Sequence, residues 1–269
     1  MPIQSAPFPP IPRDTARAAQ AAFGKGNIYV MIGDQIEPLL ADADLTDLAA
    51  AMDKPTATLG MLALVTAFQS AENLPDRRAA EAVRTRTDWK YALHLPLEGP
   101  GFDPLMLCEF RQHALRDPAA QQAFGQVLDH LAEIGLLRRL GHPRAGAAEV
   151  LIAVCTMSRL ERLAEAMHIT LEALATRQPE WLRTVTLPHW YERYSRVLAA
   201  SLLPHNQKGQ EDLARAIGMD ARYLLDKIGD RPAALALLPE VQGLRQEWQQ
   251  QFEPSAQEIR WRSPLYDAC

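Results

Sequence analysis

Apolar residues recur at steps of three or four along most of this chain, which is the spacing of one face of an α-helix. The clearest examples are two four-residue series, Leu59, Leu62, Val65 and Phe68 in the first half and Val241, Leu244, Trp248 and Phe252 near the end. β-Branched residues, which favour strands, are sparse. We therefore expect an all-α protein made of helical bundle domains.

The pattern also predicts where individual helices begin and end. We expect helices over 56–72, 77–84, 105–115 and 118–140, and two short helices around Gly218-Met219-Asp220 within 209–228. The segment Val150–Val154 is the best strand candidate, but Leu151 and Ala153 suit a helix equally well. This segment is expected either to join a helix or to form one isolated short strand.

Composition and cysteine spacing limit the class of protein. The chain has 269 residues, of which 48% are hydrophobic and 23% charged, as in globular proteins. It has neither the apolar stretch of a membrane span nor the start of a signal peptide. Cys108, Cys155 and Cys269 are too few and too far apart for a disulfide framework or a zinc site. We expect a cytoplasmic protein that contacts no membrane.

The sequence divides best at the break after Gly141. We predict a flexible N-terminal arm over residues 1–20, a helical region with a helix-turn-helix-like part over 21–141, and a second helical region over 142–269. The seven histidines are scattered without metal-ligand spacing, and no Gly-x-Ser-x-Gly or phosphate loop is present. We therefore expect no cofactor, no metal and no catalytic residue.

A cluster of cations follows the predicted turn at 73–76. It consists of Arg77, Arg78, Arg84, Arg86 and Lys90. A helix, a tight turn and a second helix have the dimensions of a helix-turn-helix, whose second helix enters the major groove of DNA. The alternative is a solvated helix face with pairs such as Arg77–Glu81. From spacing alone that alternative is favoured. The net charge of −5 and the acidic stretch Glu37–Asp53 favour a helical protein-interaction module that has lost DNA binding.

Several longer stretches resemble a group of bacterial insertion-sequence DDE transposases. In the first half they are Phe23-Gly24-Lys25-Gly26-Asn27, Tyr29, Asp34, Leu64-Val65-Thr66, Glu72-Asn73-Leu74, Asp76-Arg77, Ala79–Arg84, Asp88-Trp89-Lys90-Tyr91-Ala92-Leu93, Gly101-Phe102-Asp103 and Leu107-Cys108-Glu109-Phe110-Arg111. Later stretches are Arg159-Leu160-Glu161, Trp190–Tyr194, Leu213–Leu225 and Ser263–Asp267. Their order and spacing hold over residues 23–267.

The resemblance implies a helical DNA-binding region followed by a catalytic domain in which three carboxylates hold two divalent metals. The first of these carboxylates belongs to an Arg-Thr-Asp-Ser-Thr-His-type motif, and the matching stretch here is 144–150. Gly146 stands at the position of the aspartate, and Ala147 and Ala148 replace the hydroxyl residues. The chain also ends at Cys269, about where the catalytic domain would resume. We therefore expect that it is not an enzyme.

These observations lead to one main hypothesis, a catalytically inactive, transposase-derived protein that binds double-stranded DNA as a repressor, a competitor or a domesticated regulator. The expected DNA-binding residues are Arg77, Arg78, Arg84, Arg86, Lys90 and Arg111. Arg77 and Arg84 are assigned to base edges and the rest to phosphates. The alternative is a helical protein-interaction module or decayed fragment without DNA binding. Protein partners would be a second copy of the chain or an active transposase.

Overall fold

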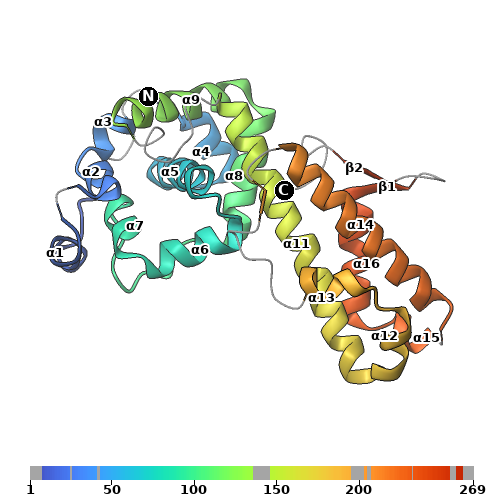
Figure 1. The fold of residues 1–269 in the computed structure, drawn as a ribbon. Helices are drawn as coiled ribbons and strands as arrows, with labels where there is room; N and C mark the ends of the chain where they lie inside the picture. Colours follow the sequence, from blue (N-terminus) through green and yellow to red (C-terminus); the bar gives the residue numbers. More distant parts are fainter. Residues whose placement is uncertain are drawn as a thin grey trace. The chain divides into compact units, whose positions relative to one another are not determined.

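The computed structural model describes residues 8–24, 26–40, 43–135, 146–194, 203–204, 207–231, 233–254 and 259–262. Most of these residues lie in helices, and the described residues also form one two-stranded antiparallel sheet. The expected all-α class is confirmed. The chain divides into two compact units, residues 1–155 and 156–268 (Figure 1).

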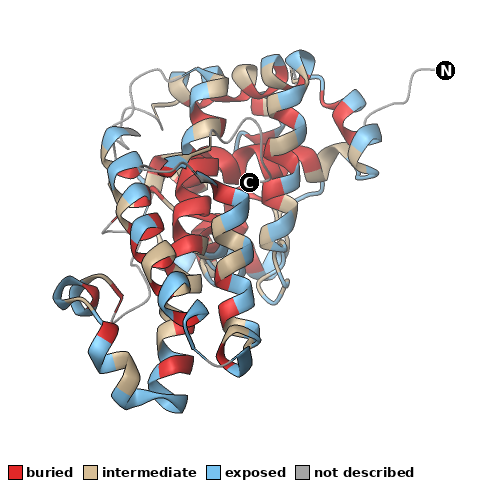
Figure 2. Ribbon diagram, turned by 90° about the vertical axis from the view of Figure 1, so that its right-hand side faces the viewer, coloured by how far each residue is buried: buried red, intermediate tan, exposed pale blue. Residues whose placement is uncertain are grey.

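Unit 1 is built around one buried helix. Its helices are α1 (Arg13–Ala22), α2 (Ile28–Gly33), α3 (Ile36–Leu40), α4 (Thr46–Met52), α5 (Thr56–Glu72), α6 (Asp76–Thr85), α7 (Thr87–Ala92), α8 (Pro104–Arg116) and α9 (Pro118–Glu133), and the first turns of α11 (Ala147–Arg177) also belong to it. Helix α5 lies in the middle of the unit (Figure 1) and is buried along most of its length. The other helices have buried and exposed sides (Figure 2), and the buried sides contribute apolar residues to the core.

The helices expected at 56–72 and 77–84 are confirmed as α5 and α6. Helix α5 ends because Asn73 adopts the left-handed conformation, with φ 55°, which asparagine tolerates better than most residues. Pro75 then stands just before the first residue of α6. Helices α8 and α9 begin at Pro104 and Pro118, each preceded by an aspartate that accepts a hydrogen bond from the first turn. The end expected for α9 at 140 lies outside the described residues.

The arm expected over residues 1–20 contains a helix. In α1, Thr15 and Ala19 are buried, and the Thr15 hydroxyl donates a hydrogen bond to the carbonyl of Leu95 at 2.8 Å. Residues 1–7 lie outside the described residues. The boundary expected at 141/142 also lies outside them, and the division into units falls after Cys155, within α11.

Unit 2 contains the rest of α11 and a set of shorter helices. These are α12 (Pro179–Val185), α13 (Pro188–Tyr194), α14 (Gln207–Gly229), α15 (Ala233–Ala236) and α16 (Pro239–Gln251), followed by strands β1 (Phe252–Pro254) and β2 (Ile259–Trp261). Helices α14 and α16 pack against each other, and β2 packs on α14. The sequence did not predict this hairpin, in which Phe252 pairs with Trp261 and Glu253 with Arg260.

The strand candidate Val150–Val154 lies within helix α11. Of the two outcomes left open by the sequence, the helical one is correct. The first turn is closed by Glu149, whose Oε2 accepts a hydrogen bond from the backbone N–H of Gly146 at 3.2 Å. The N–H groups at the start of a helix have no partner within the helix. A glutamate at the third helical position can accept a hydrogen bond from the N–H of the residue before the helix.

The two short helices expected around Gly218 are one continuous helix, α14. The expectation was wrong because Gly218 serves packing here rather than a turn. A β-carbon at Gly218 would lie 2.4 Å from Cζ of Phe252 and 2.9 Å from Cδ1 of Ile259. The backbone carbonyl of Gly218 also accepts a hydrogen bond from Nε1 of Trp248 at 2.9 Å. The missing side chain therefore lets the hairpin approach the helix.

Two further expectations concern the pairing of the cysteines and the presence of membrane-spanning segments. Cys108 is buried, and Cys155 is disulfide-bonded, which the cysteine spacing did not predict. Among the described residues, no helix is long and apolar enough to cross a membrane.

We predict that Gly218→Ala destabilises the protein, because Phe252 and Ile259 must move to admit the new methyl group. Overpacking of this kind costs about 1–3 kcal/mol. The matched control is Gly243→Ala in α16, where the glycine is exposed and a β-carbon would meet nothing within 4 Å. That change should stabilise the helix by up to about 1 kcal/mol. Urea denaturation followed by circular dichroism measures both, and equal effects of the two changes would contradict the packing argument.

Candidate nucleic-acid interface

Helix α6 presents two of the predicted arginines on its outer side. Its inner side is formed by buried residues, among them Ala79 and Val83, and packs on α5, α7 and α8. Arg77 and Arg84 are exposed. They are seven residues apart, so they lie two turns apart on one stripe of the helix, about 10 Å along its axis. This stripe is open to solvent.

Arg78 lies beside that stripe and is half-buried. Its guanidinium is 3.6 Å from the carboxylate of Glu81, one turn further along. An ion pair this exposed contributes about 0–1 kcal/mol and is easily exchanged for another anion. We define the α6 face as Arg77, Arg78 and Arg84 together with Glu81 and Thr85.

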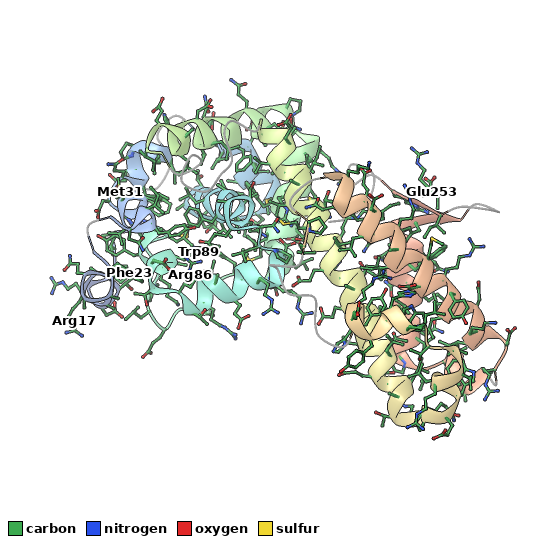
Figure 3. The ribbon with its side chains drawn as sticks, viewed as in Figure 1. Arg17, Phe23, Met31, Arg86, Trp89 and Glu253 are labelled. Carbon is green, nitrogen blue, oxygen red and sulfur yellow. The ribbon has the colours of Figure 1, made fainter. Side chains whose placement is uncertain are left out.

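Arg86 is partly buried in unit 1, with 33% of its side chain exposed, and is held by two carboxylates. Its Nη1 donates a hydrogen bond to Glu72 at 2.5 Å, and its Nε and Nη2 donate to Asp88 at 3.1 and 2.8 Å. The guanidinium also lies over the rings of Tyr29 and Trp89, about 5 Å from each centroid. Figure 3 shows Arg86 and Trp89 side by side. Arg86 therefore joins α2, α5 and α7 in the fold.

Glu72 has a second partner in this cluster. The hydroxyl of Tyr29 donates a hydrogen bond to it, and burial together with the carboxylate raises the pKa of Tyr29 well above its ordinary value. Tyr91 makes a similar bond to Asp34 at 2.6 Å, and burial followed by that carboxylate raises the pKa of Tyr91 to about 12. Both tyrosines thus stay protonated and act as donors within the fold.

Lys90 is also turned inward and is 2% exposed. Its ammonium donates to the carbonyls of Pro96 and Gly99, at 3.0 and 2.8 Å, and burial lowers the pKa of Lys90. Lys90 therefore fixes the loop between α7 and α8 from the buried side of the loop. It does not reach the surface of unit 1.

Arg111 is fully buried in α8. Its Nη2 donates to Asp76 at 2.5 Å and its Nη1 donates to Gln69 at 3.2 Å. Gln69 in turn donates to the other oxygen of Asp76 at 2.8 Å. This Gln69–Asp76–Arg111 triad joins the end of α5, the first residue of α6 and the middle of α8.

The six residues expected from the sequence therefore separate into two groups. Arg77, Arg78 and Arg84 come together on the α6 face, whereas Arg86, Lys90 and Arg111 support the fold behind it. Spacing along the chain could not make this distinction, because it does not show which carboxylate or carbonyl folds back onto each cation. Two further cations, Arg13 and Arg17, are exposed on α1 and were not predicted from the sequence. Their spacing of four residues was the available signal.

A second polar cluster lies in unit 2 around Asp220. The carboxylate, which is 8% exposed, accepts hydrogen bonds from Tyr194, at 2.7 Å, and from Arg193, and it is 3.1 Å from His189. Burial and the neighbouring carboxylate raise the pKa of Tyr194. The cluster joins α13 to α14. Within the described ranges, no three His, Cys, Asp or Glu side chains come together as a metal ion would require.

Comparison with known proteins connects this region to a family. Residues 18–113 match the family model described as Transposase domain (DUF772). The matched segment is a little over a third of the chain and runs from the second half of α1 to α8, so it contains the α6 face. Searches of curated proteins and of solved structures find no match.

We predict that Arg111→Met lowers the free energy of unfolding by about 3–5 kcal/mol, because it leaves the buried carboxylate of Asp76 without its cation. The double variant Arg111→Met with Asp76→Asn should be more stable than Arg111→Met, since no uncompensated charge remains. Arg116→Ala, an exposed change on the same helix, serves as the control and should alter stability by less than about 0.5 kcal/mol. A double variant no more stable than Arg111→Met, measured by urea denaturation, would contradict this account.

Proposed function

We propose that this chain is a transposase-derived DNA-binding protein that contacts duplex DNA through the α6 face, because residues 18–113 match the transposase-domain model. The observation that carries this proposal is the pair of exposed arginines, Arg77 and Arg84, on one stripe of a helix whose opposite side is anchored. Guanidinium groups are the side chains best suited to guanine edges and to phosphates.

The order of elements supports the same use of α6. Helix α5 is buried, the turn at Asn73–Pro75 is tight, and α6 follows with one side open. In a helix-turn-helix the second helix enters the major groove, and the first supports it. We assign Arg77 and Arg84 to base edges and Arg78 to a phosphate, which would exchange Glu81 for the phosphate oxygen.

Arg86, Lys90 and Arg111 are positioning residues in this proposal. Each is occupied by oxygen atoms of the protein itself, and each supports an element next to α6. Changing them would alter binding through the shape or stability of unit 1, because none of the three reaches the DNA itself.

We further propose that this chain alone does not cleave or join DNA. Gly146 lacks any side chain where the resemblance implies the first metal-binding aspartate. The nearest carboxylate, Glu149, lies in the first turn of α11 and binds the N–H of Gly146. Its role in the fold is thus to cap a helix. Such a protein would act as a repressor, as a competitor of an active transposase or as a domesticated regulator.

The experiment that tests DNA binding is selection from a pool of random-sequence duplex DNA at physiological salt, followed by sequencing. We expect an enriched motif, because salt at this concentration weakens contacts that do not depend on sequence. A pool without enrichment, together with weak and salt-sensitive binding, would contradict the proposal. It would favour a protein-interaction module or a decayed fragment instead.

Site-directed variants connect the motif to α6. Arg77→Ala with Arg84→Ala should abolish the enrichment and weaken binding to the selected duplex. It should also reduce the slope of log K against log salt by about one unit for each phosphate that the variant no longer neutralises. The matched control is Arg116→Ala with Arg183→Ala, which removes the same charge from exposed positions outside α6. Equal reductions of affinity in the two double variants would assign the binding to net charge and not to the α6 face.

The purified protein should leave supercoiled plasmid carrying the selected motif intact with either Mg²⁺ or Mn²⁺. The reason is that two-metal chemistry needs carboxylates that converge on the metal ions, and Glu149 is engaged with the helix end. Gel electrophoresis of the plasmid measures nicking. Nicked product from the wild-type protein that disappears in Glu149→Gln would show that the chain is catalytic.

A further inference from the structure

Helix α1 carries a second group of exposed cations on unit 1. Thr15 and Ala19 form its buried side, and Arg13 and Arg17, one turn apart, lie on the opposite side. Figure 3 shows Arg17 pointing away from the body of the unit. The one acidic residue of α1 is Asp14, which is also exposed. The outer stripe of α1 is therefore positive.

Helix α1 is fixed to the same part of unit 1 as α6. Helices α1, α7 and α6 follow one another along one edge of the unit (Figure 1), and α7 packs against both of its neighbours. Thr15 binds the carbonyl of Leu95, and the His94 ring lies 2.5 Å from the carbonyl oxygen of Pro9, just before α1. The direction of Arg13 and Arg17 is thus set by the fold.

The loop between α7 and α8 spans the distance from α1 to α6. Leu95 at its start contacts α1, and Gly101 near its end lies against Val83 and the backbone of Arg84 in α6. Gly101 has φ 77° and a β-carbon there would lie 3.2 Å from Val83, so only glycine lets the loop come this close. Lys90 holds the middle of the loop from inside.

Within the described residues, three exposed arginines on α1 and α6 lack a carboxylate partner, whereas several arginines of unit 2 have one. Four arginines of unit 2 form ion pairs: Arg162 with Glu247, Arg177 with Glu240, Arg183 with Glu180 and Arg193 with Asp220. Within the described part of the chain, none of Arg13, Arg17 and Arg84 forms an ion pair. Exposed cations left without carboxylates are the ones that can exchange counterions for phosphates.

We infer that α1 is a second DNA-contacting element, which binds backbone phosphates through Arg13 and Arg17 beside the segment that α6 reads. This inference rests on the proposed function of α6 and extends the same surface. Its contacts would be independent of base identity, because a stripe of cations facing outward from one helix binds phosphates as point charges. The double-stranded DNA held would therefore be longer than the motif read by α6.

The test compares Arg13→Ala with Arg17→Ala against the wild type on two probes, the selected duplex and a duplex of unrelated sequence. Affinity should fall by a similar factor on both probes, and the salt slope should decrease by about one unit for each phosphate that is no longer neutralised. The preference for the selected motif should stay unchanged. In contrast, Arg77→Ala with Arg84→Ala should remove that preference.

Three companion variants make the outcomes decisive. Arg13→Lys with Arg17→Lys should retain binding, because an ammonium also binds a phosphate. Glu98→Gln changes an exposed residue on the loop that spans the distance from α1 to α6. It should strengthen binding to both probes, because it removes a charge that repels phosphates. A misfolded variant would not bind more strongly. The control for charge loss is again Arg116→Ala with Arg183→Ala. If the wild type binds DNA and Arg13→Ala with Arg17→Ala binds it equally well, this inference is overturned and the α6 proposal stands. If the wild type does not bind DNA, the α6 proposal itself is overturned.

Discussion

The ion pair between Arg111 and Asp76 determines which side of α6 faces the solvent. Asp76 is the first residue of α6, and Arg111 reaches it from the middle of α8, with Gln69 of α5 completing the contact. A buried charge without its partner costs several kcal/mol, so α6 cannot rotate about its axis without breaking this triad. Arg77 and Arg84 face outward because Asp76 faces inward.

The same division between inner and outer charges runs through all of unit 1. Glu72 accepts hydrogen bonds from Arg86 and Tyr29, Asp88 also binds Arg86, and Asp34 accepts a hydrogen bond from Tyr91. Lys90 binds loop carbonyls. Apart from Arg86, these residues are among those that carry the resemblance to transposases, and their contacts explain the need for polar groups at these positions. They position α2, α5, α7 and the loop that separates α1 from α6. The candidate interface accordingly rests on helices that buried polar contacts help to hold in place.

Helical periodicity was sufficient to predict the class of the fold and the bounds of α5, α6 and α8, since each buries an apolar face or ends at a residue with its own conformational preference. Gly218 shows where local patterns fail. A glycine within a helical segment indicates either a break or a close contact, and only Phe252 and Ile259, distant in sequence, decide between them. The burial of Lys90 was equally hidden from the sequence, because the carbonyls that bind it belong to a loop without any motif.

Net charge describes the whole chain and not any one part of its surface. A balance of −5 counts every carboxylate, yet Glu72, Asp76 and Asp88 are paired with Arg86 and Arg111 inside unit 1. The arginines that remain outside, on α1 and α6, then set the local field over a distance comparable with the Debye length of about 8 Å in physiological salt. At that range a phosphate responds to the nearest few side chains rather than to the whole chain. An acidic protein can therefore present a basic face where several exposed arginines lie close together with few carboxylates beside them.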